Sequence, residues 1–257
     1  MAIHHSFFQR SAAVLLGKAH QRAAHSWAAR YGVMARPNTT DNAQLLDVVA
    51  YEPYVFDLDF EPEVIVDIGA NVGFASLQLA EKYPHASVVS FEPEPGNYKS
   101  LVENTQAVAA IKPVQAVVTP YPEREIRCYN CGGEWGFVFE SVRDETRDDF
   151  KSAEVSNEEY SRLATISPQH IVEQYVGTAA GNALLKVNIA GFEHELFAGD
   201  TSWIDAFRAV ALRVPWPMDQ RNQEALFTAF QKTKHAYAMR ALNTLLLFER
   251  EDCASTL

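Results

Sequence analysis

Two neighbouring stretches of the chain change from a strand pattern to a helical pattern at a turn. In residues 63–84, EVIVDIGANVGFASLQLAEKYP, a run rich in β-branched residues gives way at the glycines to apolar positions with helical spacing. Residues 86–108, ASVVSFEPEPGNYKSLVENTQAV, repeat this change, and Pro95 is tolerated because it falls in the first helical turn. Residues 111–119 add a third strand. This alternation predicts right-handed βαβ units.

Residues 120–165 interrupt the alternation, and further strands and helices follow them. The interruption contains an expected hairpin around Cys131 and an acidic stretch, residues 140–159, which we expect to be a solvated loop or lid. After it, the pattern predicts a helix in residues 167–176, strands in 183–189 and 209–214, and a terminal hairpin in 235–250 that turns at Leu242 and Asn243.

These elements together predict a doubly wound α/β fold with a mostly parallel sheet and a C-terminal antiparallel hairpin. Two N-terminal helices are expected before the first strand, in residues 6–32 and 39–51. Asp41 and Gln44 resemble a capping box at the start of the second helix. In such sheets, ligands bind at the carboxyl ends of the strands, where the strand order reverses.

Charge is distributed unevenly along the 257 residues. The net charge of −11 argues against a nucleic acid or an anionic membrane as the main partner. The first 40 residues contain five Arg or Lys residues and no acidic residue, so they resemble either a mitochondrial transit peptide or a helix packed on the domain or on a second copy in a homodimer. We expect residues 1–40 to be a helical extension and residues 41–257 to be one domain.

Cysteine usage and hydropathy predict a cytoplasmic protein without a metal site. No apolar run approaches the ~20 residues of a membrane span, and three cysteines make no disulfide framework for a chain this long. Cys128 and Cys131 form a CxxC pair, but only Cys253 and scattered histidines could complete a zinc site. Strand-like flanks place the pair in a hairpin turn.

The turn after the first strand carries the candidate cofactor chemistry. Asp67 ends the strand, and Gly69 and Gly73 allow a tight turn and the close approach of a ligand. Asn71 stands where a dinucleotide fingerprint requires its middle glycine, and a carboxylate at this turn would repel a pyrophosphate. S-adenosylmethionine (SAM) carries positive charge and no phosphate, and Glu92 at the end of the second strand could accept hydrogen bonds from its ribose hydroxyls.

Two other interpretations of these residues stay open. Asp67 could cap the following helix while Glu92 is an exposed strand end. A nicotinamide-dependent oxidoreductase is a further alternative, which the sign of Asp67 and the missing glycine disfavour.

Several motifs between Arg36 and Val214 resemble the FkbM family of SAM-dependent methyltransferases. They read, in order, RPNTTDNAQLLDVV, VIVDIGANVGFASLQLA, YPHASVVSFEPEPGNYKSLVENTQ, EWGFVFES and LLKVNIAGFEHELFAGDTSWI. The resemblance implies a class I methyltransferase fold of the Rossmann-like type, SAM as cofactor, and O-methylation of a small molecule such as a sugar or a secondary metabolite.

The resemblance also implies roles for individual residues. The methionine end of the cofactor would be lined by Asp67, Gly69, Ala70, Asn71, Gly73 and Phe74. Glu92, followed by Pro93, would hold the ribose. The family pattern K-x-[D/N]-x-E-G-x-E matches Lys186, Asn188 and Glu193, which would lie where the cofactor methyl group and the acceptor meet.

The chain departs from the family pattern at three positions. Ala190 replaces the usual glutamate, so we expect Lys186 to lack its partner. Arg213 and Pro215, in RVPW, replace the usual Glu-Leu-His. Three hypotheses follow: an active enzyme whose Arg213 and Lys186 attract an anionic acceptor or fit one of different shape, a SAM-binding scaffold that has lost methyl transfer, or positions that only hold the fold together.

Methyl transfer to a hydroxyl requires alignment of donor and acceptor and removal of a proton. Glu193 could be the base or could cap the next helix, and His170 borders the expected pocket. We expect His194 to be a surface helix residue. Trp216, between two prolines near the expected pocket mouth, is predicted to touch the acceptor. The identity of the acceptor is not encoded in any motif that we recognise.

Overall fold

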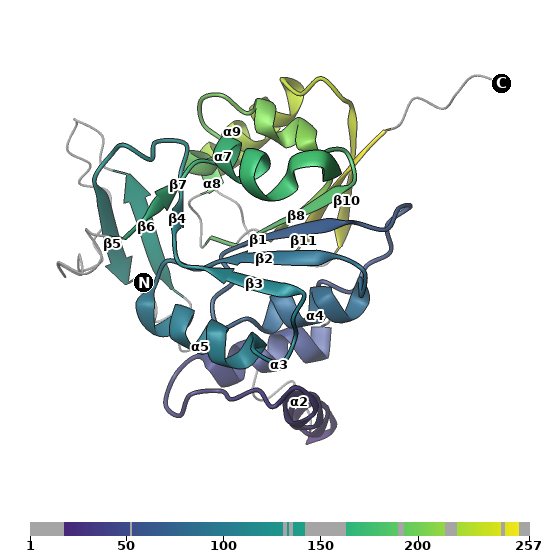
Figure 1. The fold of residues 1–257 in the computed structure, drawn as a ribbon, viewed down its shortest axis with the longest axis vertical. Helices are drawn as coiled ribbons and strands as arrows, with labels where there is room; N and C mark the ends of the chain where they lie inside the picture. The colour runs from purple at the N-terminus through teal and green to yellow at the C-terminus, as the bar shows by residue number, and fades with distance from the viewer. Residues whose placement is uncertain are drawn as a thin grey trace.

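A computed structural model describes most of the chain, namely residues 18–51, 53–130, 133, 136–141, 163–189, 193–213, 220–242 and 245–251. At its centre lies a seven-stranded sheet with the order β10-β11-β9-β8-β1-β2-β3 (Figure 1). The strands are β1 (Val64–Ile68), β2 (Ser87–Phe91), β3 (Ile111–Val114), β8 (Ala183–Val187), β9 (Phe207–Arg213), β10 (Tyr237–Leu242) and β11 (Leu245–Arg250).

The sheet is parallel from β3 to β9 and antiparallel at its C-terminal edge. β1 pairs in parallel with β2 and with β8, β2 pairs with β3, and β8 pairs with β9. β11 is antiparallel to both β9 and β10. The predicted doubly wound sheet with a C-terminal antiparallel hairpin is therefore confirmed, although Asn243 of the expected turn lies outside the described residues.

Helices cover both faces of the sheet (Figure 1). On one face lie α2 (Lys18–Tyr31), α3 (Asp41–Tyr51), α4 (Phe74–Lys82) and α5 (Pro95–Thr105). On the other lie α7 (Pro168–Ile171), α8 (Glu193–Leu196) and α9 (Gln220–Gln231), with the short helical turns η1 (Val172–Val176), η2 (Gly177–Ala179) and η3 (Ser202–Ala206). Because side chains alternate along a strand, Ile65 and Leu184 join the core under the first group, and Val66 and Leu185 join the core under the second.

The helix α2 packs on the domain itself. Ala24, Trp27 and Ala28 are buried in the same core cluster as Ile65, and the indole N–H of Trp27 donates a hydrogen bond to Glu81 of α4 (3.1 Å). The apolar face of this helix is thus used within the chain. Residues 1–17 lie outside the described part, and the boundary at residue 40 and the homodimer stay predictions.

Two small sheets extend the fold beside the main sheet. β5 (Ile126–Asn130) and β6 (Phe137–Ser141) form an antiparallel hairpin, as expected for the segment around Cys131, which is itself outside the described residues. β4 (Val117–Val118) pairs in parallel with β7 (Thr165–Ile166). Most of the acidic stretch between these elements is likewise outside the described part.

Metal-binding clusters and membrane-spanning helices are both absent from the described residues. No group of three His, Cys, Asp or Glu residues in this part of the chain is placed to hold a metal ion. None of the helices described is long and apolar enough to cross a membrane.

Gly69 lies where the ends of β1 and β8 touch. Its φ of +78° is in the left-handed region, and a Cβ atom built on it would lie 2.1 Å from the carbonyl oxygen of Asn188. The neighbouring backbone therefore excludes any side chain at this position. The close approach that requires glycine is made by the chain's own strand.

We predict that Gly69→Ala lowers the free energy of unfolding by at least about 3 kcal/mol, because it combines backbone strain with a backbone clash. Gly32→Ala is the matched control, since Gly32 has a φ of +64° and a Cβ atom there would have no heavy atom within 4 Å. It should lose only about 1 kcal/mol, the cost of the positive φ. Urea unfolding of both variants tests this, and equal losses would contradict the clash.

Candidate active site

The predicted cofactor residues gather at the point where the strand order reverses. β1 lies between β2 and β8, so the carboxyl ends of three parallel strands meet there. In the strand register, Asp67 of β1 stands opposite Lys186 of β8 and Ser90 of β2. The backbone N–H of Asn188 donates to the carbonyl of Ile68 (3.0 Å), which extends the pairing of β1 and β8 past their ends.

The turn between β1 and α4 is fastened to its neighbours by its backbone. The N–H groups of Gly69 and Ala70 both donate to the carbonyl of Phe91, at 3.1 and 3.0 Å. Gly73 has a φ of +93°, and a Cβ there would lie 2.8 Å from Leu101 Cδ1 of α5. Both glycines are therefore required by internal packing, whereas we had expected the approach of a ligand to require them. Phe74, the first residue of α4, is also buried in the core.

Asp67 and Lys186 form a buried ion pair. Lys186 Nζ lies 2.6 Å from Asp67 Oδ1, with side-chain exposures of 1% and 0%. The hydroxyl of Ser76 donates to Asp67 Oδ2 (2.6 Å), and Lys186 Nζ also donates to the carbonyl of Gly69 (2.8 Å). The expectation that Lys186 lacks a partner is therefore wrong. Ala190, on which that expectation rested, lies outside the described residues.

This ion pair changes the electrostatics expected from the sequence. Asp67 is neutralised by Lys186 and shielded from solvent, so its charge does not face a ligand as we expected. Both side chains lie on the face of the sheet covered by α3 and α4, and Lys186 Nζ is 5.6 Å from the ring centroid of Tyr54. The pair acts on the site by holding the ends of β1 and β8 together.

Arg213, at the end of β9, is also bound within the protein. Its guanidinium forms a two-pronged ion pair with Asp47 of α3, in which the Nη2–Oδ1 distance is 2.9 Å. Burial lowers the pKa of Arg213, but the hydrogen bonds and charge contributed by Asp47 and Tyr54 outweigh burial and raise it. Asp47 was not among the predicted site residues because it lies 166 positions away and no local motif marks it.

The expected attraction of an anionic acceptor loses its basis in this arrangement. That hypothesis relied on Arg213 and Lys186 as cations facing the acceptor. Each instead has its own buried or half-buried carboxylate partner. Pro215 and Trp216, the other residues of that hypothesis, lie outside the described residues.

Glu92 is the buried carboxyl group next to the turn. It is 5% exposed, and it accepts hydrogen bonds from the backbone N–H groups of Asn71 (2.8 Å) and Glu94 (3.0 Å). Burial raises the pKa of Glu92 to about 7, and the charge of Glu94 adds to the rise, while these N–H groups and the side chain of Asn97 oppose it. Asn71 adopts a φ of +50°, which aims its N–H at this carboxylate. Pro93 follows Glu92 directly.

The candidate catalytic residues after β8 are only partly placed. Asn188 is half-buried just beyond the strand, and Glu193 begins α8 with its side chain buried. His194 is 9% exposed, so the expected surface position is wrong. Its backbone N–H donates to Asn222 Oδ1 of α9 (2.7 Å), and its Nδ1 lies 3.2 Å from the same oxygen. His170 is exposed on α7 and is not brought next to these residues by any contact described here.

An open groove of about 350 Å³ lies between α8 and α9. Its lining includes His194 and Phe197 of the α8 region and Arg221 and Glu224 of α9. None of the predicted cofactor residues that the structure describes contributes to it. The groove is therefore separate from the turn and Glu92.

Breaking the Asp67–Lys186 pair should be costly. Lys186→Ala leaves a buried carboxylate without its cation, and we expect a loss of about 3–5 kcal/mol in the free energy of unfolding. Lys82→Ala is the matched control, because Lys82 pairs with Asp57, which is 95% exposed. That variant should change stability by less than about 1 kcal/mol. Urea unfolding at pH 7 compares the two, and similar small losses would contradict a structural role for the buried pair.

Comparisons with known proteins agree with the fold and the site. A family model described as the methyltransferase FkbM domain matches residues 67–242. The curated protein methyltransferase sdnD of Sordaria araneosa is 35% identical over 77 residues, which span 29% of this chain and 30% of that protein. The chain thus matches less than a third of that relative's length.

Solved structures with a similar arrangement include two methyltransferases or related proteins. The FkbM methyltransferase of Methylobacillus flagellatus is 15% identical, with 91% of this chain and 59% of that chain covered and a TM-score of 0.42. Aeropyrum pernix fibrillarin, solved with bound S-adenosyl-L-methionine, is 9% identical, with coverages of 90% and 76% and a TM-score of 0.39. Because the family model matches more than half of the chain, from β1 to β10, the chain belongs to the FkbM methyltransferase family.

Proposed function

We propose that this protein is a SAM-dependent methyltransferase that methylates a hydroxyl group of a small molecule, such as a sugar or a secondary metabolite. The observation that carries the cofactor assignment is Glu92. It places a buried carboxylate at the end of β2, beside the β1–α4 turn and at the reversal of strand order. This is where a nucleoside binds in doubly wound folds, with its ribose hydroxyls donating to an acidic residue.

The residues around Glu92 fit an adenosyl group. Each carboxylate oxygen accepts one backbone hydrogen bond, from Asn71 or Glu94, and an oxygen with one such bond has a second lone pair for a ribose hydroxyl. Glu92 and Glu94 also place negative charge here, which suits a cofactor that carries a sulfonium and an ammonium group. A dinucleotide would bring a pyrophosphate toward two carboxylates. This favours SAM over a nicotinamide cofactor.

The mechanism that we propose relies on alignment. SAM supplies, when bound, a methyl group activated by its positive sulfur. The Asp67–Lys186 pair and the contact of Asn188 with Ile68 hold the ends of β1 and β8, so the acceptor is positioned against a fixed floor. Asn188, half-buried beyond β8, is the polar side chain that we assign to orient the acceptor hydroxyl. Good alignment alone contributes about 7–11 kcal/mol to lowering such barriers.

Two residues of α8 are candidates for removing the hydroxyl proton. Glu193 offers a carboxylate. In His194, if Nδ1–H donates to Asn222, then Nε2 carries the lone pair that accepts a proton. A positioned base contributes roughly 10²–10⁴-fold in rate, so Glu193→Gln and His194→Gln assayed separately will identify it by the larger loss.

A second candidate function is SAM binding without methyl transfer. One observation favours it, namely that Lys186 and Arg213 are both engaged in internal ion pairs, so neither is available to an acceptor. Tight cofactor binding with no methylated product across a broad screen of hydroxylated acceptors would select this function. A role in the cytoplasm, in secondary metabolism, with a small-molecule partner and as a homodimer completes our proposal.

The first test is calorimetric titration with SAM and S-adenosylhomocysteine. We expect micromolar binding that weakens as the pH falls from 8 to 5.5, because protonation of Glu92 removes an acceptor for the ribose hydroxyls. Glu92→Gln should bind at least about tenfold more weakly at pH 8, with little pH dependence. Glu103→Gln, on the exposed face of α5, is the control. If the wild type binds neither ligand, the methyltransferase proposal fails.

The same residue should govern how stability depends on pH. The pKa of Glu92 is raised on folding, so the folded protein favours the protonated group below about pH 4.5 and loses stability as pH rises through about 7. Glu92→Gln abolishes this loss. The ligand-free variant should therefore gain up to about 3 kcal/mol over the wild type between pH 5 and pH 8. Urea unfolding at both pH values measures it, and a constant difference between the two proteins would refute the assignment.

A further inference from the structure

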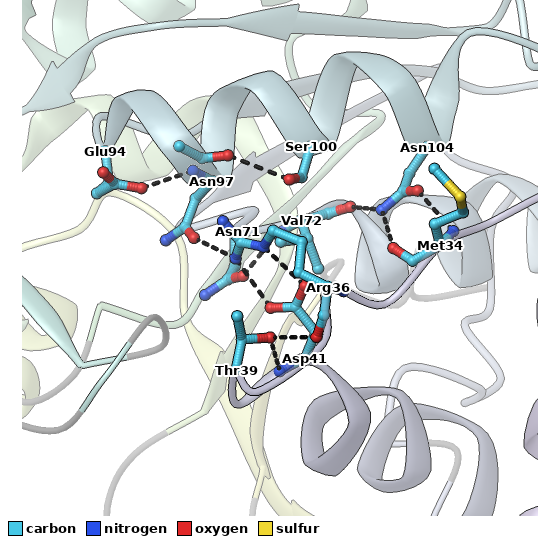
Figure 2. A network of polar contacts seen from close by, with 11 residues as sticks. Met34, Arg36, Thr39, Asp41, Asn71, Val72, Glu94, Asn97, Ser100 and Asn104 are labelled. Carbon is cyan, nitrogen blue, oxygen red and sulfur yellow. Dashed lines mark hydrogen bonds and ion pairs between the residues drawn. The ribbon is translucent and has the colours of Figure 1, made fainter.

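The segment between α2 and α3 lies against the candidate cofactor site rather than against solvent alone. Residues 33–41 run beside α5 and the β1–α4 turn, and Figure 2 shows the polar contacts that fasten them there. The side chain of Asn104, 5% exposed, accepts from the N–H of Met34 (3.0 Å) and donates to the carbonyl of Val72 (2.9 Å). This contact ties the segment to the turn that carries Asn71.

Arg36 and Asp41 form a second and stronger attachment. Arg36 Nε and Nη2 donate to the two oxygens of Asp41, each at 2.8 Å, and the N–H of Arg36 donates to the same carboxylate at 2.9 Å. Asp41 is 1% exposed. The planar guanidinium is thus held in one orientation, as bidentate pairs require.

The guanidinium passes this orientation on to Asn97 of α5. Arg36 Nη2 also donates to Asn97 Oδ1 at 2.7 Å (Figure 2). Because the side-chain oxygen of Asn97 accepts from Arg36, its NH₂ group points the other way. That side chain makes a hydrogen bond to Glu92, in which the NH₂ group is the donor and the carboxylate is stabilised in its charged form.

A backbone contact runs in parallel with this side-chain relay. The N–H of Asn97 donates to Glu94 Oε2 (2.5 Å), which caps the start of α5, and the N–H of Glu94 donates to Glu92 Oε1. Asn97 is 1% exposed, so water does not replace these bonds. The segment before α3 is thereby linked to the candidate ribose-binding carboxylate.

We infer that Arg36 is a positioning residue for the cofactor: it fixes the amide of Asn97, which in turn holds Glu92 as a carboxylate ready to accept the ribose hydroxyls. The inference rests on the proposed function only for the identity of the ligand. The effect on Glu92 itself is measured in the ligand-free protein.

The charged groups around Glu92 leave Arg36 as the cation that acts on it through a hydrogen bond. Glu94 faces it from the same loop and raises its pKa, and Arg36 with Asp41 faces it from the segment before α3. Neighbouring elements otherwise contribute the neutral Asp67–Lys186 pair of β1 and β8 and three exposed residues, Lys112 of β3 and Lys99 and Glu103 of α5.

The test is a carbon-13 NMR titration of the Glu92 carboxyl group in ligand-free protein, with the resonance assigned by Glu92→Gln. Arg36→Met should raise the midpoint by about 0.5–1 pH unit, since the donor to the carboxylate is no longer oriented. The matched control is Arg30→Met. Arg30 of α2 makes an exposed ion pair with Glu81 (2.9 Å), so its removal should leave the midpoint unchanged.

A double-mutant comparison separates action through Asn97 from a general loosening. Asn97→Ala should raise the midpoint as well, and Arg36→Met added to it should raise it no further. A wild-type midpoint in Arg36→Met, or fully additive shifts in the double variant, would overturn the inference. If Arg36→Met does not fold, Arg36→Lys replaces it, because lysine keeps the charge beside Asp41 but lacks the fork that reaches both Asp41 and Asn97.

Cofactor titration then distinguishes this inference from the proposed function. Arg36→Met should bind S-adenosylhomocysteine several-fold more weakly than the wild type at pH 7, roughly the effect of one charge-assisted hydrogen bond. The affinities should converge at pH 9, where Glu92 is ionised in both. Weakening that is equal at every pH would indicate a structural role alone and contradict the inference. Absence of binding by the wild type rejects the cofactor, whereas the Glu92 midpoints decide the role of Arg36 independently.

Discussion

The contact on which the rest of the site depends is the buried ion pair between Asp67 and Lys186. It joins the two strands that flank the reversal of strand order, with both side chains almost inaccessible to solvent. Removing two charges from water is costly, and only good geometry with further hydrogen bonds offsets that cost. Ser76 and the carbonyl of Gly69 supply those bonds. The pair therefore fixes where β1 ends and where the following turn begins.

Around this pair, the site is shaped mainly by the chain's contacts with itself. Gly69 is required by the backbone of Asn188, and Gly73 by the side chains of α5. The buried carboxylate of Glu92 is held by backbone N–H groups from the turns after β1 and β2. A binding surface built in this way is organised before any ligand arrives, so little binding energy is spent on ordering it.

The fold could be predicted from the sequence because its signals are local, whereas the charge pairs could not. The change from strand to helix pattern located β1, α4, β2 and α5, and the position of Glu92 at a strand end followed from it. The partner of Arg213 is 166 residues away, and that of Lys186 is 119 residues away (186 − 67). Asp41 illustrates the same limit: α3 begins at Asp41, as expected, but its carboxylate binds Arg36. Long-range pairing depends on strand register and helix packing, which no single motif encodes.

The pair between Asp47 and Arg213 has a consequence for how the chain acquires its structure. The helix that carries Asp47 is made early in synthesis, but its partner at the end of β9 emerges only after most of the chain. The core cluster under α2 and α3 likewise includes Ala209, Ala211 and Leu245. The N-terminal helices must therefore wait with their apolar faces exposed until the last strands arrive, and contacts of such long separation slow folding. A ribosome-bound nascent chain that lacks β9 is the species most in need of a chaperone.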